Sequence, residues 1–213
     1  VRKKTGVKVM AYFPFMIEVN NKKCLVVGGG KIALHKVKKL LPFGVEITVV
    51  AEQVCDALSV YASQIEIVNR AFRDSDIEGM DFVVAATDSE ERNHHVAELC
   101  KARNILVNAV DMKEDCSFIF PAMVKQDDLV VAISTGGQSP VAAAHLKQTI
   151  QNEIPDYYGT LLANMGACRE QVLSKVDSEE RRKEIFAHLL QYGLEHEGEI
   201  PEEQVANEIN IRG

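Results

Sequence analysis

Short apolar runs alternate with amphipathic segments through the first half of the chain. The runs are typical of buried strands and occupy residues 24–27, 45–50, 65–68, 81–86 and 105–108. Between them, apolar residues at helical spacing predict helices over residues 31–41, 54–62 and 90–103. Parallel strands need crossover connections, so strands that alternate with helices indicate an α/β fold with a parallel sheet.

The pattern changes after Asp111. Residues 117–124 and 129–134 are predicted strands joined by a short polar segment, which is typical of an antiparallel hairpin. Ser139-Pro140 then predicts a helix start, with serine as the N-cap and proline at the first helical position. The chain should end in helices, which are predicted over residues 140–153, 157–175 and 178–192.

Composition narrows the class of protein. The chain has 213 residues and a formal net charge of −7, which argues against nucleic acid or an anionic membrane as the main partner. No apolar run is long enough to span a membrane, and the start at residues 1–17 does not resemble a signal peptide. Five widely spaced cysteines without a C-x-x-C motif indicate neither a disulfide framework nor a zinc site, and favour a cytoplasmic location. Cys24 and Cys100 are expected to be small buried residues.

A glycine turn follows the first predicted strand. Gly28, Gly30 and Ala33 form a G-x-G-x-x-A pattern between an apolar strand and an amphipathic helix. The first glycine allows the tight turn, the second lets a pyrophosphate approach the backbone, and Ala33 permits close helix packing. The pattern predicts a Rossmann-type sheet that binds a dinucleotide. A purely structural turn and an S-adenosylmethionine site are the alternatives.

Residues after the next strands suggest how the dinucleotide is held. Glu52 follows the second strand and is the nearest acid for the ribose hydroxyls, although backbone at residues 51–53 is an alternative. No arginine stands beside it to bind a 2′-phosphate, so NAD is preferred to NADP. Thr87 ends the fourth strand as either a cofactor contact or a helix cap, with Asp88 or Ser89 as other caps.

Several motifs in order resemble the siroheme-synthase N-terminal module, whose standalone members are precorrin-2 dehydrogenases. They are V-V-G-G-G-K-I-A (26–33), A-A-T-D (85–88), N-A-V-D (108–111), S-F-I-F-P-A (117–122) and I-S-T-G-G-Q-S-P (133–140). The resemblance covers residues 10–150 best. It implies an NAD-binding Rossmann domain at 1–113, a dimerisation segment at 114–150 and a helical C-terminal domain at 151–213.

The resemblance also implies an activity. Members of the family oxidise precorrin-2 to sirohydrochlorin with NAD+ and are homodimers, and some also insert Fe2+ as ferrochelatases. Asp111 corresponds to the aspartate to which the family assigns catalysis, and we expect it to be a partly buried general base. A strand-end aspartate that caps the next turn is the alternative. The remaining expected contacts are to the cofactor, at Gly28, Gly30, Lys31, Ile32, Glu52, Gln53 and Thr87, and to the tetrapyrrole, at Asn108, Ser134 and Thr135. No permanently bound metal is expected, because the histidines lack the spacing of a metal motif, and His94-His95 would point in different directions.

The substrate of this family carries eight carboxylates and therefore needs cationic anchors. The candidates are Lys36, Lys38, Lys39, Arg92, Lys113, Lys125 and Lys147. Two other functions remain open: a dehydrogenase that acts on another small acid, and an NAD-sensing regulatory module without turnover. Nothing that resembles a methyltransferase module follows residue 213, so we expect another protein to methylate the precursor.

Overall fold

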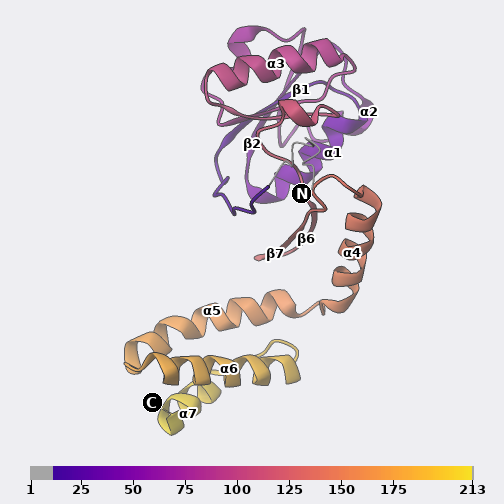
Figure 1. Ribbon diagram of the computed structural model, residues 1–213. Helices are drawn as coiled ribbons and strands as arrows, with labels where there is room; N and C mark the ends of the chain where they lie inside the picture. The colour runs from indigo at the N-terminus through magenta and orange to yellow at the C-terminus, as the bar shows by residue number, and fades with distance from the viewer. Residues whose placement is uncertain (1–11, 213) are drawn as a thin grey trace, which may run out of the picture. The chain divides into compact units, whose positions relative to one another are not determined.

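The computed structural model describes residues 12–212, which fall into two compact units. Phe13–Phe120 form the first unit, and the second comprises Tyr12 and the chain from Pro121 onward (Figure 1). The predicted absence of a signal peptide concerns in part residues 1–11, which lie outside the described residues.

The first unit is built on a five-stranded parallel sheet. Its strands are β1 (Lys23–Val27), β2 (Glu46–Ala51), β3 (Glu66–Asn69), β4 (Phe82–Ala85) and β5 (Leu106–Ala109). They lie in the order β3-β2-β1-β4-β5, and every neighbouring pair is parallel. The strand order reverses between β1 and β4, and ligands bind such sheets in the crevice outside the strand ends at this point. The predicted strands and the Rossmann-type sheet are confirmed.

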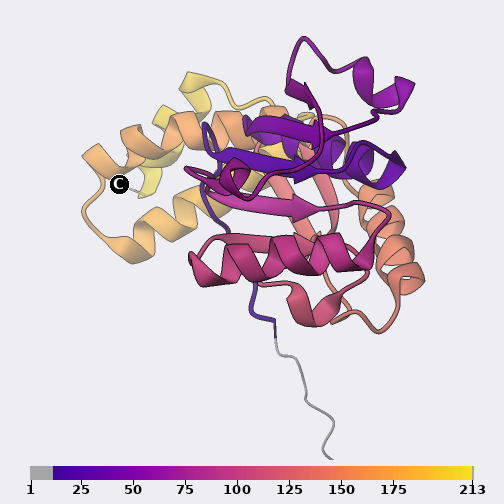
Figure 2. The same ribbon diagram turned by 90° about the horizontal axis from the view of Figure 1, so that it is seen from above.

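Helices cover both faces of this sheet, and each face has its own core. On one face, α1 (Lys31–Leu40) and α2 (Asp56–Ser59) pack over residues such as Val26 and Val49. On the other face, α3 (Glu90–Ala102) packs over Leu25 and Val83, as the view in Figure 2 makes visible. Short 3-10 helices occupy Leu41–Phe43, Asp74–Ile77 and Lys113–Asp115. Cys24 and Cys100 are fully buried, one in each core, as predicted.

The second predicted helix is wrong in length. It was expected over residues 54–62, but α2 ends at Ser59. Beyond it, Tyr61 and Ala62 donate their N–H groups only three residues back, which makes tight turns, and Val60 is exposed. Leu58 is the buried residue of α2, and Tyr61 packs against the same core from the turns that follow the helix.

The second unit opens with a hairpin. Its strands, β6 (Ala122–Gln126) and β7 (Leu129–Ile133), pair antiparallel, and the turn is only Asp127-Asp128. The predicted strand over residues 117–124 is therefore wrong for residues 117–121. Ser117 instead donates its N–H to the carbonyl of Val107, and Phe118 and Phe120 pack on the core of the first unit.

Four helices follow the hairpin. They are α4 (Pro140–Glu153), α5 (Tyr158–Lys175), α6 (Glu179–Glu195) and α7 (Glu202–Arg212). Ser139 caps α4 as predicted, because its side chain accepts the N–H of Ala142. The last helix, α7, was not predicted: the acidic tail conceals Val205 and Ile209, which are buried against α5 and α6.

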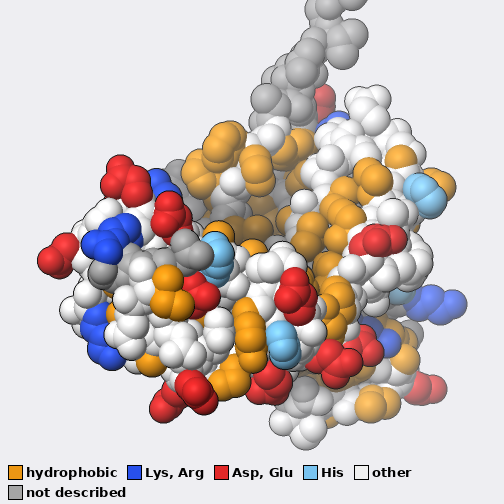
Figure 3. Space-filling view, turned by 90° about the horizontal axis from the view of Figure 1, so that it is seen from below, with side chains coloured by type: hydrophobic (Ala, Val, Ile, Leu, Met, Phe, Trp, Pro, Cys, Tyr) orange, Lys and Arg blue, Asp and Glu red, His pale blue; other side chains and the backbone are white. Residues whose placement is uncertain are grey.

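The predicted fold class is confirmed, with a parallel sheet, a hairpin and a helical end. The division at residues 113 and 150 stays a prediction. No helix among residues 12–212 is long and apolar enough to cross a membrane. On the face drawn in Figure 3, basic side chains are scattered among acidic and hydrophobic ones.

Candidate nucleotide-binding site

The turn after β1 depends on glycine for two different reasons. Gly28 has φ +119, and a Cβ there would collide with the carbonyl of Ala86 after β4. At Gly29 a Cβ would collide with the carbonyl of Gln53, a role that the sequence reasoning missed. Gly30 differs, because nothing lies within 4 Å of the position of its Cβ. The first two glycines thus bring three strand ends together, and the third leaves open space at the start of α1.

The start of α1 is suited to a phosphate. Gly30 is its N-cap and supplies no side-chain hydrogen bond, and the first turn contains no acidic residue. The first N–H groups of a helix lack partners within the helix, and its dipole favours an anion. Lys31 and Ile32 stand on this turn and are exposed.

A cavity of about 580 Å³ opens beside this turn. Its volume is within the usual range for a small-molecule site. Five of the predicted cofactor residues line it, namely Gly28, Gly30, Glu52, Gln53 and Thr87. Lys31 and Ile32 lie outside the lining. The cavity is therefore at the carboxyl ends of the strands, where the strand order predicts a ligand.

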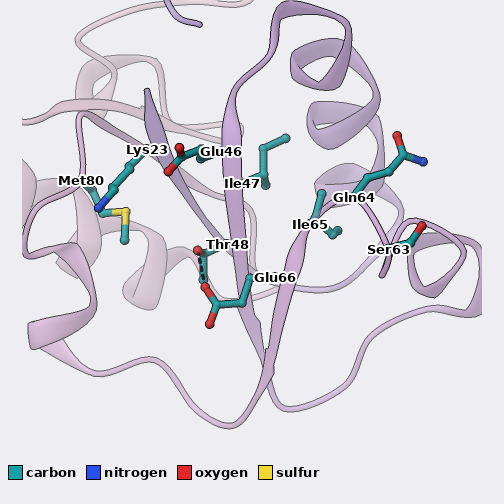
Figure 4. A pocket seen from close by; sticks show the side chains of 9 residues that line it. All are labelled: Lys23, Glu46, Ile47, Thr48, Ser63, Gln64, Ile65, Glu66 and Met80. Carbon is teal, nitrogen blue, oxygen red and sulfur yellow. Dashed lines mark hydrogen bonds between the residues drawn. The ribbon is translucent and has the colours of Figure 1, made fainter. Parts of the chain in front are cut away.

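A second hollow, of about 540 Å³, lies at the opposite edge of the sheet (Figure 4). Lys23, Glu46 and Glu66, which begin β1, β2 and β3, contribute to its lining. Thr48 donates a hydrogen bond of 3.0 Å to Glu66 across it. Since it borders the amino ends of the strands, it is remote from the glycine turn and is not the nucleotide site.

Two arginines reach the cavity from elements that are distant in the sequence. Arg92 of α3 lies 3.8 Å from the Glu52 carboxylate and 3.5 Å from that of Asp88. Arg70 follows β3 and binds both oxygens of Asp76 at 2.7 Å. The preference for NAD rested on the lack of an arginine beside Glu52 in the sequence. That reason is wrong, because the fold places arginines where the local sequence has none.

Thr87 lines the cavity, but its hydroxyl is engaged within the protein. It donates to the Asn93 side-chain oxygen at 2.8 Å, and Asn93 donates back to the Thr87 carbonyl at 3.1 Å. Asn93 is 3% exposed and was not singled out from the sequence. Ser89, one of the alternatives, is the N-cap of α3. Thr87 therefore fixes the shape of the β4 end that borders the cavity.

Asp111 stands two residues beyond β5 and has φ +61. Its side chain is exposed, so the expected partial burial is wrong. Val110 still donates its N–H to the carbonyl of Ala85, the last residue of β4. Asp111 is the next residue and follows the end of the sheet. Asp111 thus lies at the same carboxyl edge of the sheet as the cavity.

Asn108 is nearly fully buried on β5 and holds a lysine. It accepts a hydrogen bond of 3.1 Å from Lys36 of α1 and donates to the Phe118 carbonyl at 3.1 Å. Burial lowers the pKa of Lys36 to about 8, and the charge of Lys39 acts in the same direction. Ionisable groups with shifted pKa values are common at functional sites, so the contact between Lys36 and Asn108 makes this edge of the sheet a candidate binding site.

The two predicted serine-turn residues belong to the second unit. The Thr135 hydroxyl donates to the Ser139 carbonyl and accepts the Ser139 N–H, at 3.1 and 3.2 Å. The Ser134 hydroxyl accepts the Gly136 N–H at 3.2 Å. These bonds shape the turn before α4.

The adjacent histidines each find a carboxylate. His94 lies 2.6 Å from Asp115, and His95 lies 2.9 Å from Asp74. Lys101 binds the other oxygen of Asp115 at 2.7 Å. Within residues 12–212, no three His, Cys, Asp or Glu side chains are grouped to hold a metal ion.

Two segments of this chain match known protein families. Residues 15–122 match the family described as "Putative NAD(P)-binding", and residues 126–153 match "Sirohaem biosynthesis protein central". A siroheme synthase of Thioalkalivibrio sulfidiphilus is 40% identical over 184 residues, which are 85% of this chain and 38% of that protein. One from Photorhabdus laumondii is 32% identical over 214 residues, or 96% of this chain and 46% of the relative. The chain thus spans less than half the length of these relatives.

A solved structure agrees on the fold. The protein titled "SirC, precorrin-2 dehydrogenase" superposes with a TM-score of 0.68 at 24% identity, over 94% of this chain and 98% of that one. The family match also supports the predicted use of NAD. The chain therefore belongs to the putative NAD(P)-binding family through residues 15–122, and its residues 126–153 match the central segment of sirohaem-biosynthesis proteins.

Proposed function

We propose that the chain is an NAD-dependent precorrin-2 dehydrogenase that produces sirohydrochlorin. One observation carries the proposal: the sheet edge that holds the nucleotide cavity also presents Asp111, the residue that the family resemblance assigns to catalysis. The relatives named siroheme synthase support the same chemistry.

The residues of the site fit NAD+, and each group of them has a separate role. When bound, NAD+ supplies the hydride acceptor. The start of α1 and the glycine turn would hold its pyrophosphate, and Glu52 its ribose. Asp111, exposed at the sheet edge, would take the proton that leaves precorrin-2 as the hydride leaves, so that two electrons and two hydrogens are removed in total.

The decisive experiment is an anaerobic assay of the purified chain with enzymatically made precorrin-2 and NAD+. NADH and sirohydrochlorin should appear together in equal amounts. Asp111→Asn should reduce kcat by about a hundredfold or more, because general-base catalysis contributes on this order, and should leave NAD+ binding unchanged. Glu114→Gln, an exposed acid in the next turn, is the matched control and should retain full activity.

The result also separates the alternatives. Folded protein that binds NAD+ but forms no NADH would contradict the dehydrogenase and favour the NAD-sensing regulatory module. No relative named above supports that module. Iron insertion, a homodimer formed through the hairpin, a cytoplasmic location and tetrapyrrole contacts at Ser134 and Thr135 stay predictions. Adding Fe2+ after the oxidation is complete tests the first of these.

A further inference from the structure

The Lys36 side chain is partly buried against the first unit although it carries a charge. Its ammonium donates to the Asn108 side-chain oxygen at 3.1 Å and lies 4.1 Å from the centre of the Phe120 ring. One polar partner comes from β5 and one aromatic partner from the segment that follows it. The position of the ammonium is therefore fixed by elements that are distant in the sequence.

Asn108 is held so that only its oxygen faces the lysine. Its amide nitrogen donates to the Phe118 carbonyl at 3.1 Å and to the Cys116 sulfur at 3.4 Å. Both donors are thereby used, and the amide cannot turn without losing them. A neutral asparagine thus orients the ammonium without neutralising it.

No counter-ion completes this arrangement. Within residues 12–212, no carboxylate lies within 4 Å of the Lys36 ammonium. Burial and the charge of Lys39 lower the pKa of Lys36, while Cys116 and Asp111 act more weakly in the opposite direction. A partly buried cation without an ion-pair partner is unfavourable, and an ammonium has three N–H groups to donate. An anion bound at Lys36 would relieve both deficits.

We propose that Lys36, held in place by Asn108, binds a carboxylate of the substrate beside Asp111. The inference rests on the proposed function, which supplies a substrate with eight carboxylates. Asp111 follows Asn108 by three residues, so a carboxylate anchored at Lys36 would hold the ring near the base. Lys36 is then a binding residue that positions the substrate and takes no part in the proton transfer.

The first test needs no variant. The wild-type chain with NAD+ is labelled with trace acetic anhydride, with and without an octacarboxylate porphyrin, and labelling at each lysine is measured by mass spectrometry. Lys36 should be protected by the porphyrin. Lys22, exposed just before β1 at the amino edge of the sheet and 3.2 Å from the Asp81 carboxylate, is the internal control and should be labelled equally in both samples.

The second test compares Lys36→Met with Lys22→Met, which removes the same charge at the other edge of the sheet. Loss of a charged hydrogen bond should raise the KM of Lys36→Met for precorrin-2 by about tenfold or more, with kcat changed less than about twofold. Lys22→Met should keep the KM within about twofold. Lys36→Arg, which keeps the charge, should recover part of the loss, and unchanged NAD+ binding would verify that each variant is folded.

The outcomes distinguish this inference from the proposed function. If the wild-type chain oxidises precorrin-2 but the porphyrin does not protect Lys36, and Lys36→Met has a wild-type KM, the inference is overturned and the function stands. If the wild-type chain neither oxidises precorrin-2 nor binds the porphyrin, both are overturned. Protection confined to Lys36, together with a raised KM, supports both.

Discussion

Replacement of Glu52 by glutamine should shift nucleotide preference from NAD+ towards NADP+. Glu52 follows β2, where an acid binds the ribose hydroxyls of NAD and repels a 2′-phosphate. Its carboxylate also lies 3.8 Å from Arg92 in the same cavity. The substitution keeps the side-chain size, removes the negative charge and leaves Arg92 available to a phosphate.

The structure sets the size of this effect. The Glu52 side chain is 65% exposed, so charges near it interact as they do in water. Two unit charges about 4 Å apart then interact by about 1 kcal/mol, and a phosphate carries up to about two charges. Removing about 2 kcal/mol of repulsion should tighten NADP+ binding by about 30-fold. NAD+ binding should weaken by about fivefold, because the ribose loses hydrogen bonds to a charged acceptor.

Equilibrium binding of NAD+ and NADP+ by calorimetry measures both changes. Adding Arg92→Met to the Glu52→Gln chain should cancel part of the gain in NADP+ affinity, since the arginine is then absent. Glu46→Gln removes an exposed acid at the other edge of the sheet and should leave both affinities unchanged. An unchanged ratio of the two affinities in Glu52→Gln would refute the assignment of this residue to the ribose.

Three further perturbations test the fold and its charges. Gly28→Ala should lower the free energy of unfolding by at least about 2 kcal/mol and abolish NAD+ binding, because φ is +119 and a Cβ collides with the Ala86 carbonyl; thermal unfolding and nucleotide titration measure both. The hydrogen bond to Asp115 raises the pKa of His94, so the stability that it contributes is present below the unfolded pKa of about 6.5 and is lost as pH rises through the folded value. The stability difference between wild type and His94→Gln in urea should therefore shrink as pH rises above about 6.5, and a constant difference would contradict the ion pair. Leu189→Ala empties a fully buried position of α6 and should cost about 2–5 kcal/mol in chemical denaturation, whereas a loss below about 1 kcal/mol would refute its place in the helical core.

Local features of the chain were predictable from sequence. The strands of the parallel sheet and the glycine turn have short-range signals: an apolar run, then a glycine that alone tolerates φ +119, then helical spacing. Ser139 as a helix cap belongs to the same class, because the cap and the N–H that it accepts are three residues apart. These features depend on neighbours in the chain and survive without knowledge of the fold.

Long-range features were not predictable in the same way. Arg92 meets Glu52 across 40 residues of sequence, and Lys36 meets Asn108 across 72. The segment 117–121 has strand-like residues, but Phe118 and Phe120 are used to cover the core instead. The last helix, α7, could not be predicted because its sequence is rich in acidic residues and, of its described side chains, only Val205 and Ile209 are buried. In each case tertiary packing decided what local preference left open.

The left-handed backbone at Asp111 affects how natural variation at this position should be interpreted. A φ of +61 is tolerated by Gly, Asn and Asp but strained for longer or branched side chains. The backbone alone should therefore favour this small set in related sequences, and an aspartate shared among them would not by itself indicate catalysis. Glutamate would keep the acid but add backbone strain, so its effect would mix a chemical cause with a conformational one. Asparagine keeps the backbone geometry and removes only the charge, which makes the choice between Asp and Asn in relatives the informative comparison.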